Sequence, residues 1–206
     1  EDRMRKKQQI KMTTPKGTAI WPWLNEPNRK FEPAGVYAVN LRMMMADAQD
    51  FIDNITKVRD EHHNEQTKEL KKKIKKADLP IIEVVDDQGD ETGEVELKLK
   101  LKASYEYDGK TITQRPLVMD SKQKPIGDEV RIGSGTTMRC GVEVRPWYVA
   151  SQGVGVSLRL RVVQVIDLVE FGGGGASGFD FEDEEGFESV AAAMDEHEGD
   201  DLEGMM

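Results

Sequence analysis

Polar and apolar residues alternate along several stretches of the chain, which is the pattern of strands with one buried face. The alternation is most regular over residues 95–103, where aliphatic side chains take one face and a glutamate and three lysines take the other. Shorter alternating stretches occur at 35–41, 138–144 and 154–162. These stretches predict a domain built mainly of antiparallel strands.

A hairpin is predicted at the end of the longest alternating stretch. Asp108 and Gly109 form a preferred two-residue turn, so we expect the strand to continue to Tyr107 and to return over residues 111–119. Pro116 cannot donate a hydrogen bond to a strand ladder, which places the returning strand at an edge or a bulge. Four or five such strands with glycine-rich corners are typical of a small closed or half-closed barrel.

One segment, residues 47–77, has a helical period instead. It contains no Gly or Pro, and its apolar residues recur at spacings of three and four. Asp47 is expected to cap its start, and Pro80 closes it. We therefore predict one long helix, or two helices with a break near residues 62–64, whose lysine-rich last turns complement the helix dipole.

The net charge of −10 is divided unevenly along the chain. Residues 172–206 hold 12 of the 39 acidic side chains and no Lys or Arg, which leaves residues 1–171 with a net charge of +2. The glycine-rich start of the acidic part is typical of a flexible linker. The rest has too little apolar surface to offset the entropy of ordering. We predict a folded domain over 1–171 and a linker with a disordered acidic tail over 172–206.

Nothing in the sequence assembles a catalytic or metal site. There are three histidines and one cysteine, and no nucleophile motif, phosphate loop or paired-cysteine motif is present. Cys140 lies on the apolar face of its stretch, which predicts a buried thiol rather than a reactive one. No apolar run approaches the roughly 20 residues of a membrane span, and no secretory signal is visible. We expect no catalysis, no metal and no cofactor.

The alternation also predicts three basic strand faces. Their side chains are Lys98, Lys100 and Lys102 on one strand, Arg139 and Arg145 on a second, and Arg159 and Arg161 on a third. Like charges about 7 Å apart along a strand repel each other unless an anion lies over them. A single basic pair is equally typical of a solvated sheet face. Three of them on one small β-domain favour a groove that follows a nucleic-acid backbone.

Aromatic side chains supply a second element of such a groove. Trp147 ends its strand, where an exposed ring could stack on bases without reading their sequence. Interior packing is the alternative for the others. Tyr105 and Tyr107 share the parity of the aliphatic face, and Trp21 and Trp23 belong to a residue type that is usually well buried.

The acidic tail has an electrostatic interpretation and a simpler alternative. A polyanion tethered to a basic groove competes with DNA for it, and DNA binding would free the tail to bind partner proteins. The alternative is a generic solubility tail. We assign partner binding to Asp180, Glu182, Asp183, Glu184, Glu185, Asp200, Asp201 and Glu203.

Four segments, 35–41, 97–105, 118–122 and 133–174, match a family pattern. The last is the most specific, because it combines a glycine turn, a strand ending in Pro-Trp, a Gly-x-Gly strand start and Phe-Gly-Gly-Gly before the acidic residues. On these segments the chain resembles the single-stranded DNA-binding proteins of podovirus-type bacteriophages over most of residues 17–175.

The resemblance implies a mainly β fold, an OB-fold-like five-stranded Greek-key barrel with one long helix inserted and a disordered acidic C-terminal tail. It implies sequence-nonspecific coating of single-stranded DNA in phage replication, recombination and repair in the host bacterial cytoplasm. Family DNA-binding positions fall on Lys98, Lys100 and Trp147, with Tyr105 near them. Implied partners are phage replication proteins (DNA polymerase and helicase-primase) through the tail, and a second copy in a homodimer.

Two features depart from the family pattern. Ala34 occupies a position where a basic residue precedes the strand, which removes one phosphate contact. The chain ends in Met205 and Met206 instead of an aromatic residue, so these methionines would have to serve as the apolar anchor for a partner. Two alternative functions remain open: a protein-binding adaptor that acts through its acidic tail, and an RNA-binding cold-shock-like module.

Overall fold

A computed structural model describes residues 9–170, which form ten strands and one helix. In chain order the elements are β1 (Ile10–Thr13), β2 (Gly17–Asn28), β3 (Val36–Met44), α1 (Met45–Leu70), β4 (Ile81–Val85), β5 (Glu91–Lys102), β6 (Ser104–Tyr107), β7 (Lys110–Thr113), β8 (Leu117–Met119), β9 (Thr137–Val149) and β10 (Gly153–Asp167).

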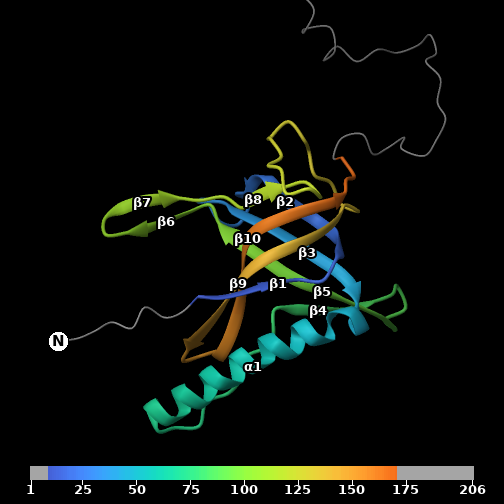
Figure 1. The fold of residues 1–206 in the computed structure, drawn as a ribbon. Helices are drawn as coiled ribbons and strands as arrows, with labels where there is room; N and C mark the ends of the chain where they lie inside the picture. Colours follow the sequence, from blue (N-terminus) through green and yellow to red (C-terminus); the bar gives the residue numbers. More distant parts are fainter. Residues whose placement is uncertain (1–8, 171–206) are drawn as a thin grey trace, which may run out of the picture. The chain divides into compact units, whose positions relative to one another are not determined.

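Five of the strands close into a barrel (Figure 1). Their order is β9, β2, β3, β5 and β10, and the pairing of β10 with β9 completes the circle. Neighbours are antiparallel except β5 and β10, which run parallel at the pair Lys100 and Arg159. This is the strand order of an OB-type Greek-key barrel. The expected fold class, a mainly β barrel of OB type with one inserted helix, is confirmed.

Strand β5 shows why the alternating pattern folds in this way. Val95, Leu97 and Leu99 are fully buried in the barrel, and each contributes about 1.5–3 kcal/mol by leaving water. A slip of one residue would move lysines into the core, so the pairing of β5 with β3 is fixed by burial. The same alternation buries Cys140 in β9, as predicted.

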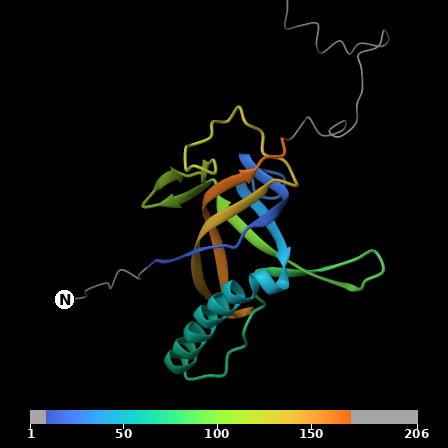
Figure 2. The ribbon, with the colours of Figure 1, turned by 45° about the vertical axis from the view of Figure 1, so that its right-hand side comes forward.

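The inserted helix α1 is a single helix that packs across one end of the barrel (Figures 1 and 2). It buries Phe51, Ile52 and Ile55 against the core, and too few of its residues are apolar for it to cross a membrane. The N-cap of the helix is Met44, whose side chain makes no capping hydrogen bond. The expected N-cap at Asp47 is therefore wrong. The first turn therefore relies on burial rather than on capping.

The end of α1 also differs from the prediction, which extended the helix to residue 77. The helix stops at Leu70, and Lys71 takes a left-handed conformation with φ of 50°. The chain then returns to β10, where the Val154 N–H donates to Lys75 O at 3.0 Å and the Ala77 N–H donates to Val154 O at 2.8 Å. Most of the lysines expected to complement the helix dipole therefore lie beyond the helix.

The predicted hairpin turn is confirmed. Asp108 and Gly109 have φ of 50° and 71°, the conformation of a type I′ turn between β6 and β7. The two strands pair only with each other and project from the barrel (Figures 1 and 2). Tyr105 is 38% exposed and Tyr107 is 69% exposed, so interior packing of these tyrosines is wrong.

The returning strand expected over 111–119 is divided in two. β7 belongs to the hairpin, whereas β8, just after Pro116, pairs in parallel with β10.

The fifth barrel strand is β2, which the alternation did not indicate, because bulges interrupt its pairing with β3. Interior packing of its tryptophans is wrong as well: Trp21 is 79% exposed with a positive φ, and Trp23 is exposed too. The expected domain boundary and the tail lie outside the described residues.

Candidate nucleic-acid interface

Charged side chains form a row across the outer face of four neighbouring strands. Lys100 on β5 pairs with Arg159 on β10, Arg159 pairs with Glu143 on β9, and Glu143 pairs with Lys11 on β1. Directly paired residues project from the same face of a sheet. The barrel therefore brings charged side chains of β5, β9 and β10, the three strands for which basic faces were predicted, onto one continuous surface.

Further cations flank this row along the strands. We define the cationic cluster as Lys98, Lys100, Lys102, Arg145, Arg159 and Arg161. Lys100, Lys102 and Arg145 are exposed, while the other three are half-buried. The cluster is thus open to solvent at Lys100, Lys102 and Arg145 and more enclosed at Lys98 and at the two arginines of β10.

Glu143 lies at the centre of the arginines and is only 4% exposed. Its Oε1 accepts a hydrogen bond from Arg161 Nε at 2.7 Å, and its Oε2 accepts one from Arg145 Nη2 at 3.1 Å and lies 3.9 Å from Arg159 Nη1. Burial alone would raise the pKa of this carboxyl, but the hydrogen bonds from Arg161 and Arg145 outweigh it and the pKa is lowered. One carboxylate therefore holds two guanidinium groups by hydrogen bonds and attracts a third.

The arginines also repel one another. Burial and the charges of Arg145 and Arg161 lower the pKa of Arg159, and the attraction of Glu143 does not compensate. The guanidinium remains charged, because arginine does not lose its proton in proteins. A second anion placed over the cluster would relieve this repulsion, so the cluster is electrostatically suited to a polyanion.

Gln114, which follows β7, connects the cluster to the projecting hairpin. Its Oε1 accepts a hydrogen bond from Arg161 Nη1 at 3.3 Å, and its Nε2 donates to Lys102 O at 2.8 Å. Tyr105, the second residue of β6, lies at this base of the hairpin and is exposed. The base of the hairpin therefore places an exposed aromatic ring beside the cluster.

Trp147 lies at the end of the cluster, two positions beyond Arg145 on β9. It pairs in register with Gly155 on β10, and a methyl group added to Gly155 would collide with the indole, 2.7 Å from Cε2. The half-buried ring therefore rests over the glycine backbone on the outer side of the strands. An indole held in this way offers a surface for stacking.

Among the predicted DNA-binding residues, all of which lie within residues 9–170, Arg139 is the one that the structure does not bring into this group. It pairs with Gln164 and lines a separate hollow with Asp47 and Asp50 of α1. Two nearby carboxylates make that hollow a poor place for a phosphate. Glu143 and Gln114, which organise the cluster, were not predicted, because their roles depend on contacts between distant segments.

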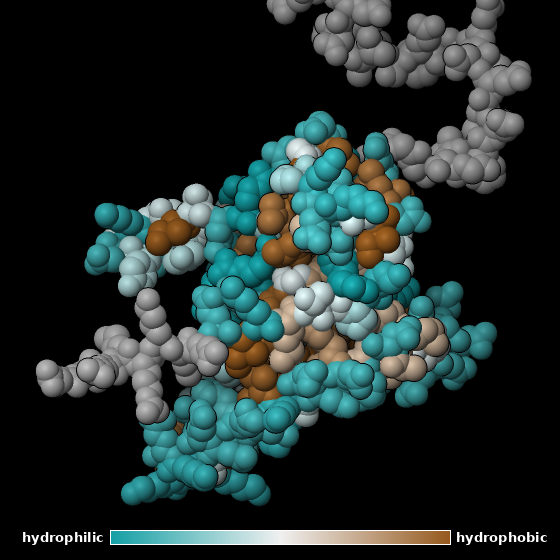
Figure 3. All heavy atoms as spheres, viewed as in Figure 1, coloured by the Kyte–Doolittle hydropathy of each residue, from teal (hydrophilic) through white to brown (hydrophobic). Residues whose placement is uncertain are grey.

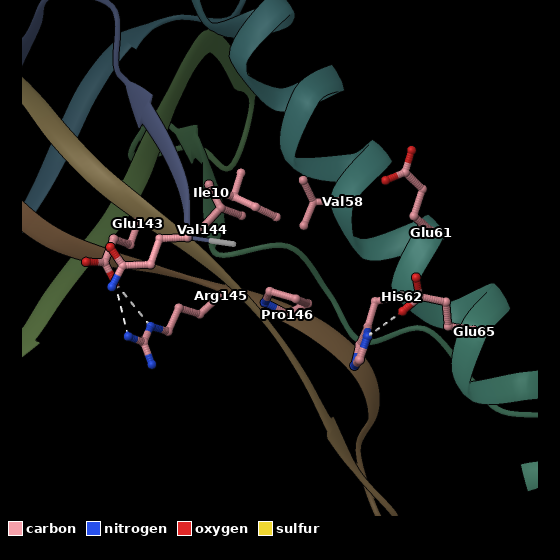
Figure 4. Close-up of a pocket in the computed structure, with 10 residues that line it drawn as sticks. Ile10, Val58, Glu61, His62, Glu65, Glu143, Val144, Arg145 and Pro146 are labelled. Atoms are coloured by element: carbon pink, nitrogen blue, oxygen red, sulfur yellow. Dashed lines mark hydrogen bonds and ion pairs between the residues drawn. The ribbon is translucent and has the colours of Figure 1, made fainter. Parts of the chain in front are cut away.

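A hollow of about 360 Å³ separates α1 from β9 beside the cluster (Figure 4). Glu143 and Arg145 line one end, while His62 and Glu65, whose Nδ1 and Oε2 atoms are 3.6 Å apart, line the other. Glu61 adds a third carboxylate. These acids disfavour a polyanion inside the hollow, so a bound strand is expected to pass over the exposed side of Arg145.

The fold and this surface define a class of protein, an oligonucleotide-binding barrel with a basic face and aromatic side chains at its borders. Residues 20–168 match the family described as single-stranded DNA-binding protein, bacteriophage T7. The chain belongs to this family, and the resemblance found in the sequence is confirmed.

Individual relatives support this assignment. The single-stranded DNA-binding protein of Escherichia phage T7 is 29% identical over 187 residues, covering 82% of this chain and 78% of the relative. That of Enterobacteria phage T3 is 30% identical over 180 residues, covering 79% and 75%. Both are named for DNA binding and neither for an enzymatic activity, in agreement with the expectation that the chain is not an enzyme.

Solved structures show the same architecture. The crystal structure of gp2.5, a single-stranded DNA-binding protein encoded by bacteriophage T7, matches with a TM-score of 0.68 and 26% identity, covering 88% of this chain and 100% of the other. The single-stranded DNA-binding protein of bacteriophage Enc34 in complex with single-stranded DNA matches with a TM-score of 0.54 and 12% identity, covering 78% and 88%. At that identity the second match supports the fold alone.

Proposed function

We propose that the protein binds single-stranded DNA without sequence preference through the cationic cluster. The observation that supports this most directly is the register of Lys100, Arg159 and Glu143 across three strands, which joins separate basic faces into one surface. The relatives from phages T7 and T3 are single-stranded DNA-binding proteins by name, which favours this ligand over RNA or duplex DNA.

The arrangement accounts for affinity without sequence specificity. The lysines of β5 contact phosphates and release counterions, which makes binding steeply dependent on salt. The arginines around Glu143 are already held in position, so less side-chain entropy is lost on binding than with free side chains. Trp147 and Tyr105 stack on bases, and each stack contributes about 1–3 kcal/mol whatever the base.

In this proposal the protein coats DNA during phage replication, recombination and repair in the host bacterial cytoplasm. Residues 172–206, with their net charge of −12, compete with DNA for the cationic cluster. Covalent attachment through the predicted linker would give the tail an effective concentration of about a millimolar at the cluster. When DNA displaces it, the tail recruits replication partners, DNA polymerase and helicase-primase. A second copy of the chain is a further proposed partner, in a homodimer.

The test is a titration followed by intrinsic tryptophan fluorescence. Three tryptophans are present and none is fully buried, so a bound strand has several rings to quench. We expect oligo-dT to quench the emission and added salt to reverse the effect. Oligo-U and duplex DNA are the comparison ligands. A response to oligo-U alone would favour the RNA-binding alternative, and no response to any nucleic acid would favour the adaptor.

A further inference from the structure

A second group of cations lies between α1 and β4, in the segment that returns to β10. We define the lysine segment as Lys71, Lys72, Lys73 and Lys75, all of which are exposed. No carboxylate of the described residues lies within 4.0 Å of their amino groups, whereas Lys76 Nζ pairs with Asp60 Oδ1 at 3.1 Å. The segment thus presents four positive charges without a close counter-charge in residues 9–170. Figure 3 shows a hydrophilic surface in this part of the molecule, around α1.

The backbone holds this segment in a fixed place beside β10. Lys75 O accepts a hydrogen bond from the Val154 N–H, and Ile74 is buried. Gly153, with φ of 95°, lies so close that an added methyl group would collide with the Lys75 backbone and come within 2.8 Å of its Cγ. Only glycine tolerates this combination of conformation and contact. The lysines are therefore attached to an ordered part of the barrel.

The segment begins where the aromatic end of the cationic cluster stops. Gly153 is two residues from Gly155, which supports Trp147, and Lys72 Nζ lies 6.0 Å from the centre of the Tyr148 ring. Along β10, the path from Arg159 to Gly153 measures about 20 Å at roughly 3.3 Å per residue. The lysine segment therefore lies beside the end of β10 that pairs with Trp147 and Tyr148, whose rings face opposite sides of β9.

We propose that the lysine segment extends the path of the same DNA strand beyond Trp147. This inference rests on the proposed function, since it assigns a second part of the binding surface to the same ligand. Alternating phosphates and bases suit a track in which amino groups follow aromatic rings, whereas the tail offers carboxylates without bases. A short oligonucleotide fills the cluster alone, and a longer one reaches the lysine segment.

The experiment compares two oligo-dT lengths on the full chain, about 5 and about 16 nucleotides, near the limits of what one OB barrel covers. The variant combines Lys72→Gln, Lys73→Gln and Lys75→Gln. Its matched control combines Lys16→Gln, Lys57→Gln and Lys122→Gln, three exposed lysines elsewhere that change the net charge equally. We expect the variant to lower the salt slope by about 2 with the long oligonucleotide, at about 0.7 per phosphate contact. The slope with the short one should stay unchanged.

The outcomes separate the two proposals. An equal effect at both lengths, no effect at either, or the same effect in the control variant overturns the extended path. Tighter binding of the long oligonucleotide by the variant also overturns it, because the segment would then be a docking place for the acidic tail. If the unsubstituted protein binds neither oligonucleotide, the proposed function itself fails.

Discussion

The indole of Trp147 on β9 lies over Gly155 on β10, in a space that any larger residue at position 155 would fill. Gly153, the other glycine of the Gly-x-Gly strand start, lies against the backbone of Lys75. The two glycines therefore have different structural roles. One supports an aromatic ring at the end of the cationic cluster, and the other admits a chain segment to the edge of the barrel.

Gly155→Ala is expected to displace the Trp147 ring. Overpacking should lower the free energy of unfolding by about 1–3 kcal/mol. Losing one stacking surface should weaken oligo-dT binding about 5-fold or more, the equivalent of at least 1 kcal/mol. The control is Gly141→Ala on β9, where the added methyl would lie 3.4 Å from Val162 Cβ and meets no ring. Urea unfolding and fluorescence titration measure both effects, and equal binding losses in the two variants would count against a stacking role for Trp147.

Lys98→Ala combined with Lys100→Ala tests the phosphate contacts on β5. Each lost contact should lower the slope of log affinity against log salt by about 0.7, so we expect a decrease of about 1.4. The matched control combines Lys122→Ala and Lys124→Ala, two lysines that are exposed in the turn after β8. Titrations with oligo-dT at several salt concentrations give the slope. A slope that is the same in both variants and in the unsubstituted protein would place the DNA path elsewhere.

The barrel and most of the cluster could be predicted because they follow from the alternation of polar and apolar residues along the strands. Lys98 and Leu99 must face opposite sides of β5, and no other arrangement buries the aliphatic residues. The pattern did not show that the strand leaves the barrel after Lys102. There the Ala103 N–H donates to Gly35 O, and the chain beyond it pairs only within the hairpin. Parity alone therefore left interior packing open as an alternative for Tyr105 and Tyr107.

The other differences also arise from contacts between distant segments. Leu70, Ile74 and Ala77 have helical spacing, but hydrogen bonds to Val154 hold the last part of this segment extended along β10. Glu143 occupies an ordinary polar position in the sequence of β9. Its role arises only when β10 brings arginines to it, which no local pattern can show.

Glu143→Gln tests whether one carboxylate organises the arginines. A folded-state pKa below the ordinary value means that the carboxylate stabilises the fold above the unfolded pKa, near 4.3. This contribution is lost as pH falls through the folded pKa. The variant should therefore be less stable at pH 7, by about 1–3 kcal/mol, and the difference should shrink below pH of about 4. Urea unfolding across this range measures it, and a difference independent of pH would contradict the assignment.

Cys140 should be protected from thiol reagents in the folded protein. Burial raises the pKa of its thiol to about 12, so almost no thiolate is present at neutral pH, and the side chain is inaccessible. We expect labelling by a disulfide reagent to be slow in buffer and fast in denaturing urea. Fast labelling of the native protein would show that β9 opens from the barrel. Bound oligo-dT should slow any labelling that remains, because it stabilises the folded state.

Deleting residues 176–206 is expected to tighten oligo-dT binding and to abolish recruitment of partner proteins. The reason is electrostatic, since the deleted part holds all 12 acidic side chains of the tail. The gain in affinity should therefore be largest at low salt and vanish as screening increases. A full-length variant with these acids changed to Asn and Gln is the matched control and should bind as tightly as the deletion. If only the deletion tightens binding, the tail acts by its bulk, and equal affinity with and without it would refute competition altogether.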